Sequence, residues 1–257
     1  MKNYLIFPMK YLNVTQTYAG KTSHLPHTTG TPKDYPVDLG GYDSGRDWVY
    51  CPCDEIKIVR IYGVGNSGTN TIWLTSTDKV IFADGTSDYV TIQFTHSNDD
   101  DLKYLKVGQV FMRDDKMFRE GKDGATANHI HLSVGKGKSK GNGWAKNSNG
   151  KWVLTTTGGA IKPEKAFYVD EDFTVIKKTG GLNFKAMPKW KEYITLKKVN
   201  IRDGEGDNVG TSFPVVGTYK KGERILVDLV YTNRYGNKWA HTDKGWVNYQ
   251  NLKEAEK

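Results

Sequence analysis

Histidine is the residue type with the clearest chemical pattern in this sequence. Two copies, His129 and His131, lie in the segment HIHLSVG (129–135). Side chains alternate between the faces of a β-strand, so His129, His131 and Ser133 would share one face and the apolar residues between them the other. Such a pair of imidazoles could bind a metal ion or act in catalysis. A chance occurrence of the pattern is an equally good explanation. Other histidines lie earlier, near expected strand ends or turns: His24, His27 and His96.

Asp38 could supply a carboxylate to the same site. It lies in a short apolar segment, PVDL (36–39), where a buried carboxylate needs a partner. A zinc ion held by one carboxylate and two imidazoles would meet that need and leave a fourth position for a water, whose pKa would fall toward about 7. Considered alone, Asp38 is more simply explained as a turn residue before Gly40 and Gly41.

Short strands must carry these residues. Apolar and polar residues alternate with a period of two in five segments bounded by Gly, Asn, Asp or Ser, which is typical of an antiparallel sheet. The segments are 55–63, 69–76, 79–83, 88–96 and 129–135. With 28 Gly, 15 Tyr and 7 Trp, the composition also favours strands joined by turns, so the fold class is predicted to be mostly β. Helical periodicity is weak, and the best candidate is 162–169.

Other segments suggest structural explanations. The two cysteines, Cys51 and Cys53, are more simply explained as small buried core residues than as a disulfide or part of a zinc finger. The segment 135–151 is rich in Gly, Ser, Asn and Lys and is predicted to be a mobile basic loop. Three consecutive carboxylates, residues 99–101, follow His96 and are predicted to be a solvated loop.

The chain is long enough for two domains. Between residues 177 and 192 the periodicity is lost and Gly, Pro and Lys increase, so this segment is predicted to be a linker. Residues 1–176 would form the first domain. Residues 193–257 again show short strands separated by turns, and about 65 residues of this kind suit a small β barrel.

The first domain resembles the lysostaphin and LytM-like zinc endopeptidases of bacterial peptidoglycan. Four ordered motifs carry the resemblance: Ser23-His24 with YPVDLGG (35–41), VYCPCDEIKIVRIYG (49–63), YVTIQFTHS (89–97), and KVGQV (106–110) with GATANHIHLSVG (124–135). The resemblance implies an antiparallel-sheet peptidase in which His24, Asp38 and His131 bind Zn²⁺, while His96 and His129 act in catalysis. Thirteen residues separate His24 from Asp38 where many members have three, so His27 is an alternative first ligand.

The second domain is similar to the bacterial SH3-type modules attached to wall hydrolases. The matching segments are VNIRDGEG (199–206), YKKGERILV (219–227) and KWAHTDKGWVNYQNL (238–252). The resemblance implies an SH3-like β barrel. Four aromatic residues could form a flat groove for wall peptide or glycan, namely Tyr231, Tyr235, Trp239 and Trp246. Filling the barrel core is the alternative role for Trp239 and Trp246, and the more fitting one for Trp246.

Together these features predict a zinc metalloendopeptidase that hydrolyses peptide bonds in bacterial peptidoglycan, with a bacteriophage endolysin as the expected biological role. A tail-associated or bacteriocin-like hydrolase is a near alternative. Two rivals belong to other classes: a non-catalytic wall-binding or activator protein, and a basic nucleic-acid-binding β-barrel protein. The bond cleaved, in a stem peptide, a cross-link or a glycine bridge, is left open.

Charge and hydropathy limit the partners. With 37 Lys+Arg against 29 Asp+Glu, the net charge of +8 favours a polyanionic partner, such as nucleic acid, anionic lipid or acidic wall polymers, and charge alone does not choose among them. Neither predicted domain is basic enough to indicate specific nucleic-acid binding. The sequence contains no apolar run of about 18 residues, the length needed to span a bilayer. The first 20 residues lack the features of a signal peptide, so we expect a monomer made in the host cytoplasm and acting at the wall after release.

Overall fold

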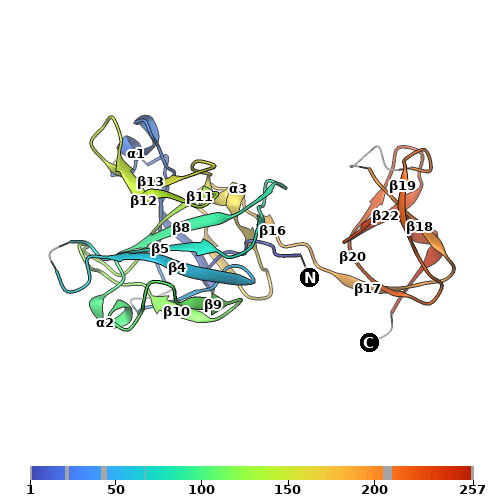
Figure 1. Cartoon of the computed structure of the whole chain (residues 1–257), viewed down its shortest axis with the longest axis horizontal. Helices are drawn as coiled ribbons and strands as arrows, with labels where there is room; N and C mark the ends of the chain where they lie inside the picture. Colours follow the sequence, from blue (N-terminus) through green and yellow to red (C-terminus); the bar gives the residue numbers. More distant parts are fainter. Residues whose placement is uncertain (1, 21–22, 42–44, 67, 205–209, 256–257) are drawn as a thin grey trace. The chain divides into compact units, whose positions relative to one another are not determined.

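The chain forms two compact units, Lys2–Met187 and Pro188–Lys257 (Figure 1). The structure is a computed structural model that describes residues 2–255 except 21–22, 42–44, 67 and 205–209. Both units consist mainly of short strands, which confirms the mostly β class predicted from the period-two alternation. Among the described residues, no helix has the length and apolarity needed to cross a membrane.

An eight-stranded sheet is the centre of the first unit. All neighbouring strands in it are antiparallel except β1 and β15, which are parallel. In spatial order the strands are β15 (Val175–Lys178), β1 (Tyr11–Gln16), β2 (Val37–Leu39), β11 (Ile130–Lys136), β8 (Val90–Thr95), β5 (Thr71–Ser76), β4 (Glu55–Tyr62) and β9 (Val110–Met112).

The two faces of this sheet differ in chemistry. On one face, Ile72, Phe94 and Leu132 belong to the main hydrophobic core, which also contains the buried Cys51 and Cys53. On the other face, threonine hydroxyls pair between strands, as Thr75 and Thr91 do with their Oγ1 atoms 2.9 Å apart. Both faces of β5 and β8 are buried. The polar face is the one that carries His131, because the register pairs His131 with Thr95.

Smaller elements surround the sheet. Four two-stranded sheets are formed by β3 (Trp48–Tyr50) with β10 (Lys116–Arg119), β6 (Val80–Ile81) with β7 (Ser87–Asp88), β12 (Ser139–Lys146) with β13 (Trp152–Thr156), and β14 (Tyr168–Val169) with β16 (Lys185–Ala186). The α-helices are single short turns: α1 (Leu25–Thr29), α2 (Asp99–Leu102) and α3 (Pro163–Ala166). The expected helix at 162–169 is thus limited to α3, and the chain continues directly into β14.

One loop prediction is wrong, and a second is confirmed only in part. Most of the segment 135–151 is not a mobile loop, because β12 pairs with β13 and its Trp144 packs edge-on against the buried Trp73, with ring centroids 5.1 Å apart. The acidic segment 99–101 begins the helical turn α2 instead of a loop, and Asp99 and Asp100 are exposed as predicted whereas Asp101 is not. The Asp101 side chain is 5% exposed and forms ion pairs with Arg46 and Arg119.

The predicted linker, 177–192, spans the division between the two units. Its first residues continue β15, which pairs in parallel with β1, and β16 pairs in parallel with β14. Both pairings belong to the first unit, which extends to Met187. Beyond Pro188 the chain soon enters the first strand of the second unit, β17 (Lys191–Thr195).

The second unit is one seven-stranded sheet around its own core. The spatial order is β19 (Val215–Tyr219), β18 (Val199–Arg202), β22 (Gly245–Asn248), β21 (Lys238–Thr242), β20 (Arg224–Thr232), β17 and β23 (Leu252–Glu254), with a 3-10 turn η2 (Tyr249–Asn251). Neighbouring strands are antiparallel. The last two residues of the motif VNIRDGEG, 205 and 206, lie outside the described residues. The likeness to SH3-type barrels remains a prediction.

Candidate metal centre

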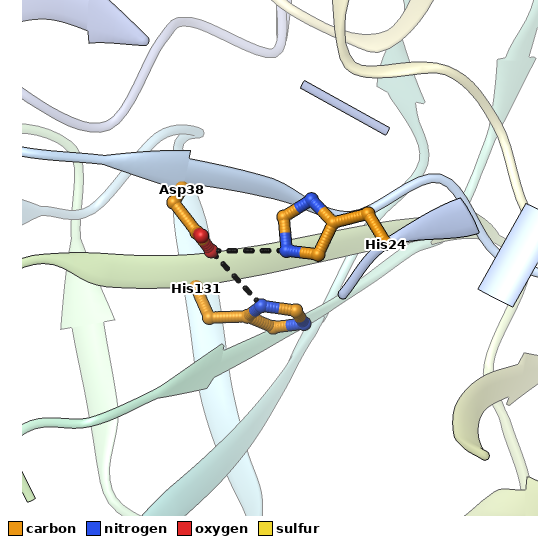
Figure 2. A group of neighbouring side chains, drawn as sticks. All are labelled: His24, Asp38 and His131. Carbon is orange, nitrogen blue, oxygen red and sulfur yellow. Dashed lines mark hydrogen bonds and ion pairs between the residues drawn. The ribbon is translucent and has the colours of Figure 1, made fainter. Parts of the chain in front are cut away.

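Asp38 and His131 face each other across adjacent strands. The register of β2 with β11 makes the two residues direct partners, and Nδ1 of His131 lies 3.0 Å from Oδ1 of Asp38. His24 reaches the same oxygen from the residue before α1, with its Nε2 3.2 Å away (Figure 2). One ligand atom from each of the three side chains can be chosen so that all lie within 4.8 Å of one another.

The hydrogen bonding of His24 fits a metal ligand. Its Nδ1 lies 3.1 Å from the carbonyl oxygen of Thr17, which can only accept, so Nδ1 carries the hydrogen. In the neutral ring, Nε2 then presents a lone pair toward the Asp38 carboxylate. A nitrogen lone pair and a carboxylate oxygen can lie this close together when a cation is to bind between them. A hydrogen bond from the other ring nitrogen to a backbone carbonyl, as here with Thr17, commonly orients a ligand imidazole. The ring is well protected, with 2% of the His24 surface exposed.

The electrostatics of the trio favour a charged Asp38 and a neutral His131. Burial by itself would raise the pKa of Asp38, but the close contacts of its carboxylate with the His131 and His24 imidazoles outweigh burial and hold this pKa well below its ordinary value. Burial lowers the pKa of His131 despite its carboxylate neighbour. One anionic oxygen and neutral imidazole nitrogens form a donor set that zinc prefers. Ligands about 2.1 Å from a tetrahedral zinc ion lie about 3.4 Å apart, and the two imidazole nitrogens lie 3.2 and 3.0 Å from Asp38 Oδ1.

His96 and His129 lie beside this trio. Their ring centroids are 4.5 Å apart, and Nε2 of His129 is 3.9 Å from Oδ1 of Asp38. Nδ1 of His96 donates to the carbonyl of Asp123 at 2.7 Å, and Nδ1 of His129 donates to that of Ala127 at 2.9 Å. These acceptors fix the tautomer, so each neutral ring keeps its lone pair on Nε2. Burial lowers the pKa of His96 to about 4.

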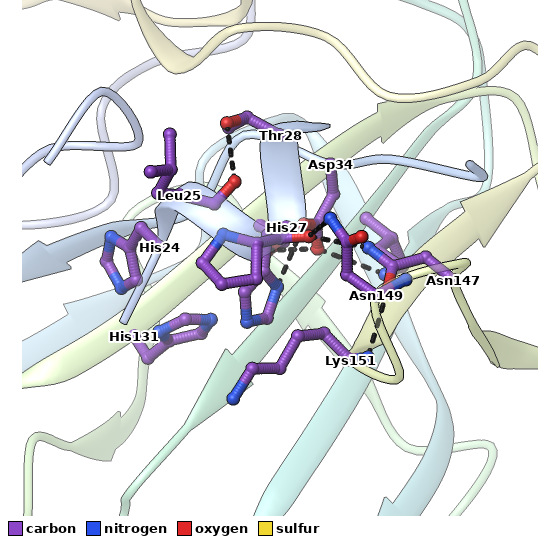
Figure 3. A network of polar contacts seen from close by, with 12 residues as sticks. His24, Leu25, His27, Thr28, Asp34, His131, Asn147, Asn149 and Lys151 are labelled. Carbon is purple, nitrogen blue, oxygen red and sulfur yellow. Dashed lines mark hydrogen bonds and ion pairs between the residues drawn. The ribbon is translucent and has the colours of Figure 1, made fainter. Parts of the chain in front are cut away.

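His27 lies next to the trio but is bound to another carboxylate. Its Nδ1 is 3.1 Å from Oδ1 of Asp34, and its ring centroid is 5.9 Å from that of His131. The Asp34 side chain is buried and also accepts hydrogen bonds from the Ser133 hydroxyl and the Leu154 amide. Figure 3 shows this network, with His27 beside His131. The geometry thus groups His24, rather than His27, with Asp38 and His131.

The turn between β12 and β13 holds α1 in place. The amide of Asn147 donates to the Pro26 carbonyl at 2.8 Å, and Asn149 donates to the same oxygen and to the hydroxyl of Thr29 (Figure 3). A Cβ at Gly30 would lie 2.3 Å from Nδ2 of Asn147, so a larger residue there would displace the Asn147 side chain. Sequence reasoning did not identify Asn147 or Asp34, because neither stands in a motif and the contacts that give them a role, with Pro26 and with Ser133 and Leu154, join segments distant in sequence.

Of the three aromatic residues predicted to bind cell walls, Tyr235 and Trp239 line one hollow of the second unit and Tyr231 does not. Tyr235, 70% exposed, and the buried Trp239 line a hollow of about 430 Å³ together with Phe213, Arg234 and Asn248. Tyr231 instead packs against the buried pair Trp239 and Trp246. Trp246 fills the interior, and its Nε1 donates to the Gly204 carbonyl at 2.8 Å.

Comparisons with known proteins give only a distant likeness. No model of a protein family matches the sequence, and no curated protein matches it either. Among solved structures, the NMR solution structure of lysostaphin is similar with a TM-score of 0.33 and 16% identity, over 84% of this chain and 79% of that one. A structure of the antimicrobial peptidase lysostaphin from Staphylococcus simulans gives 0.26 and 17%, over 82% and 78%. Similarity at this level is no evidence of a shared activity.

Proposed function

We propose that this protein is a zinc-dependent endopeptidase that cleaves peptide bonds in bacterial peptidoglycan. The observation that carries the proposal is the convergence of His24 Nε2 and His131 Nδ1 on one oxygen of Asp38, from three separate stretches of sequence. The ordered motifs shared with the lysostaphin and LytM-like endopeptidases support the choice of substrate.

The residues divide into those that would hold the ion and those that would move protons. Zinc, when bound by His24, Asp38 and His131, supplies a Lewis acid for the scissile carbonyl and lowers the pKa of a water. His96 and His129 each present Nε2 on an oriented ring. One of them would accept a proton from the attacking water, and the other, once protonated, would donate a hydrogen bond to the developing oxyanion. His96 is neutral at pH 7 and is therefore able to accept.

Chelation separates this proposal from its rival, a non-catalytic wall-binding protein. We expect the protein to release new amino groups from purified cell walls, to lose this activity with a strong chelator, and to regain it with added zinc. Unchanged wall binding without release of amino groups would support the rival. Mass spectrometry of the fragments would identify the bond cut.

We further propose that the second unit binds the wall and that the protein acts as a phage endolysin, made in the host cytoplasm and reaching the wall once the membrane is disrupted. A binding module joined to a catalytic unit raises the local concentration of an insoluble substrate. The exposed Tyr235 beside Arg234 offers an aromatic and cationic surface for such binding. Peptidoglycan and acidic wall polymers are the proposed partners.

A further inference from the structure

His96 has an unusual backbone conformation. Its φ of +84° lies in the left-handed region, which only one other non-glycine residue adopts among the described parts of the chain, Asp114. A side chain other than glycine is strained there and stays only where its surroundings hold it. Such strain is often found at functional sites, so the groups that hold His96 are of interest.

Four hydrogen bonds link His96, Asn70 and Asp123 in a closed cycle. The His96 amide donates to the Asn70 carbonyl at 3.0 Å, and the Asn70 amide donates to Oδ2 of Asp123 at 2.6 Å. The Asp123 amide donates back to the His96 carbonyl at 3.1 Å, and Nδ1 of His96 donates to the Asp123 carbonyl at 2.7 Å. Backbone and imidazole are therefore fixed by the same two residues.

Further contacts make this hydrogen-bond cycle rigid. Asn70 is 1% exposed, and its side-chain amide donates to the Ser97 carbonyl at 3.0 Å and to Oδ1 of Asp99 at 2.8 Å. The backbone approaches closely at Gly121, which forms an isolated bridge with His129, and a Cβ at Gly121 would lie 2.5 Å from the His96 carbonyl oxygen. The residues come from three segments that are distant in sequence, so their meeting is a product of the fold.

We propose that Asn70 and Asp123 form a positioning clamp for His96, which fixes its tautomer and the direction of its Nε2. The inference rests on the proposed catalytic role of His96 and extends it to two residues that do not touch the metal ligands. Without the Asp123 carboxylate, the Asn70 amide loses its acceptor and the loop that carries the Asp123 carbonyl is released. The imidazole would then lose its fixed donor bond, while the ligand trio would be unaffected.

Three variants of the full chain test the clamp. Asp123→Ala removes the acceptor, Asp123→Asn retains an oxygen that can accept from Asn70, and Asp100→Ala removes a carboxylate that is 80% exposed and serves as the control. We expect Asp123→Ala to lower kcat about 10–100-fold on a soluble wall peptide, with KM and zinc content unchanged. Asp123→Asn should recover most of this loss, and Asp100→Ala should match the wild type.

An NMR measurement tests the same point without relying on activity. In protein labelled with ¹⁵N-histidine, the wild type should show His96 protonated only at Nδ1, and Asp123→Ala should show a mixture of tautomers. If wild-type protein cleaves no wall peptide, the proposed function fails and this spectrum still decides whether the clamp exists. Unchanged kcat and tautomer in folded Asp123→Ala, or an equal loss in Asp123→Asn, would overturn the clamp.

Discussion

Asp38 Oδ1 is the atom that organises the candidate centre, because nitrogen atoms of three imidazoles lie within 3.9 Å of it. His24 and His131 approach to hydrogen-bond distance, whereas His129 is farther away. This difference divides the residues into an inner pair of ligands and an outer imidazole, and the division can be tested by mutation.

Replacing Asp38 should affect metal binding, and replacing His129 should affect turnover. We expect Asp38→Ala to weaken zinc binding by more than about 100-fold and to abolish activity, because the anionic ligand is lost. His129→Ala should keep its zinc and lose about 10²–10⁴-fold in kcat. Zinc content by atomic absorption after dialysis, measured beside kcat, checks both. The reverse pattern would mean that ligand and catalytic roles are exchanged.

The pKa of His96 predicts a loss of stability in acid. The unfolded chain binds a proton at this residue below about pH 6.5, whereas the folded protein binds it only near pH 4. The free energy of unfolding should therefore decrease as pH falls through this window, by about 3 kcal/mol in total for this residue. Burial of His131 acts in the same direction.

Urea unfolding of the metal-free protein, prepared with a chelator, measures the free energy of unfolding between pH 7 and pH 4. His96→Asn is the matched control, since asparagine tolerates the left-handed backbone and does not titrate in this range. The variant should show a shallower decrease, and an identical slope would argue against a buried neutral His96.

At the scale of elements, the β12–β13 turn supports the helix that follows His24. We expect Asn147→Ala to lower the free energy of unfolding by about 1–3 kcal/mol, because the Pro26 carbonyl and the Lys151 amide lose a buried partner. Zinc affinity should fall with it, since α1 begins directly after a ligand. Thermal melts with and without zinc measure both quantities. Asn142→Ala, on an exposed part of β12, should change neither.

Period-two alternation predicted β4, β5, β8 and β11 to within about two residues, because one face of each strand lies on a hydrophobic core. The same rule could not find β12, whose Gly and Lys content is that of a loop. Its strand conformation depends on Trp144 packing against Trp73, and these residues are distant in sequence.

At the site, the resemblance identified a trio that the fold does bring together. It could not choose between His24 and His27, since that choice depends on which carboxylate each ring meets. Nor could it show the supports of His96, because three of the four bonds around this residue join two backbone groups or a backbone carbonyl and the ring.

For the whole molecule, the two separate cores predict that catalysis and wall attachment can be divided. A chain ending at Met187 should retain zinc and cleave soluble wall peptides at about the wild-type rate. It should lose most of its binding to intact walls in a sedimentation assay. Loss of peptide cleavage in the folded, zinc-loaded fragment would contradict independent units.

Within the full chain, Tyr235→Ala should weaken wall binding about 10-fold, on the scale of one exposed aromatic contact. Tyr104→Ala, 75% exposed in the first unit, is the matched control and should bind walls normally. Equal binding by both variants would move the wall contact away from the hollow beside Trp239.

The pairing of Asp38 with His131 across β2 and β11 also makes zinc binding depend on correct folding. Val37 and Leu39 flank Asp38 and are fully buried. A shift of the β2 register by one residue would therefore turn the Asp38 carboxylate toward the hydrophobic core and place an aliphatic side chain opposite His131. A misaligned chain would then be unable to capture zinc at all. Metal uptake during refolding therefore reports that these two strands have found their proper alignment.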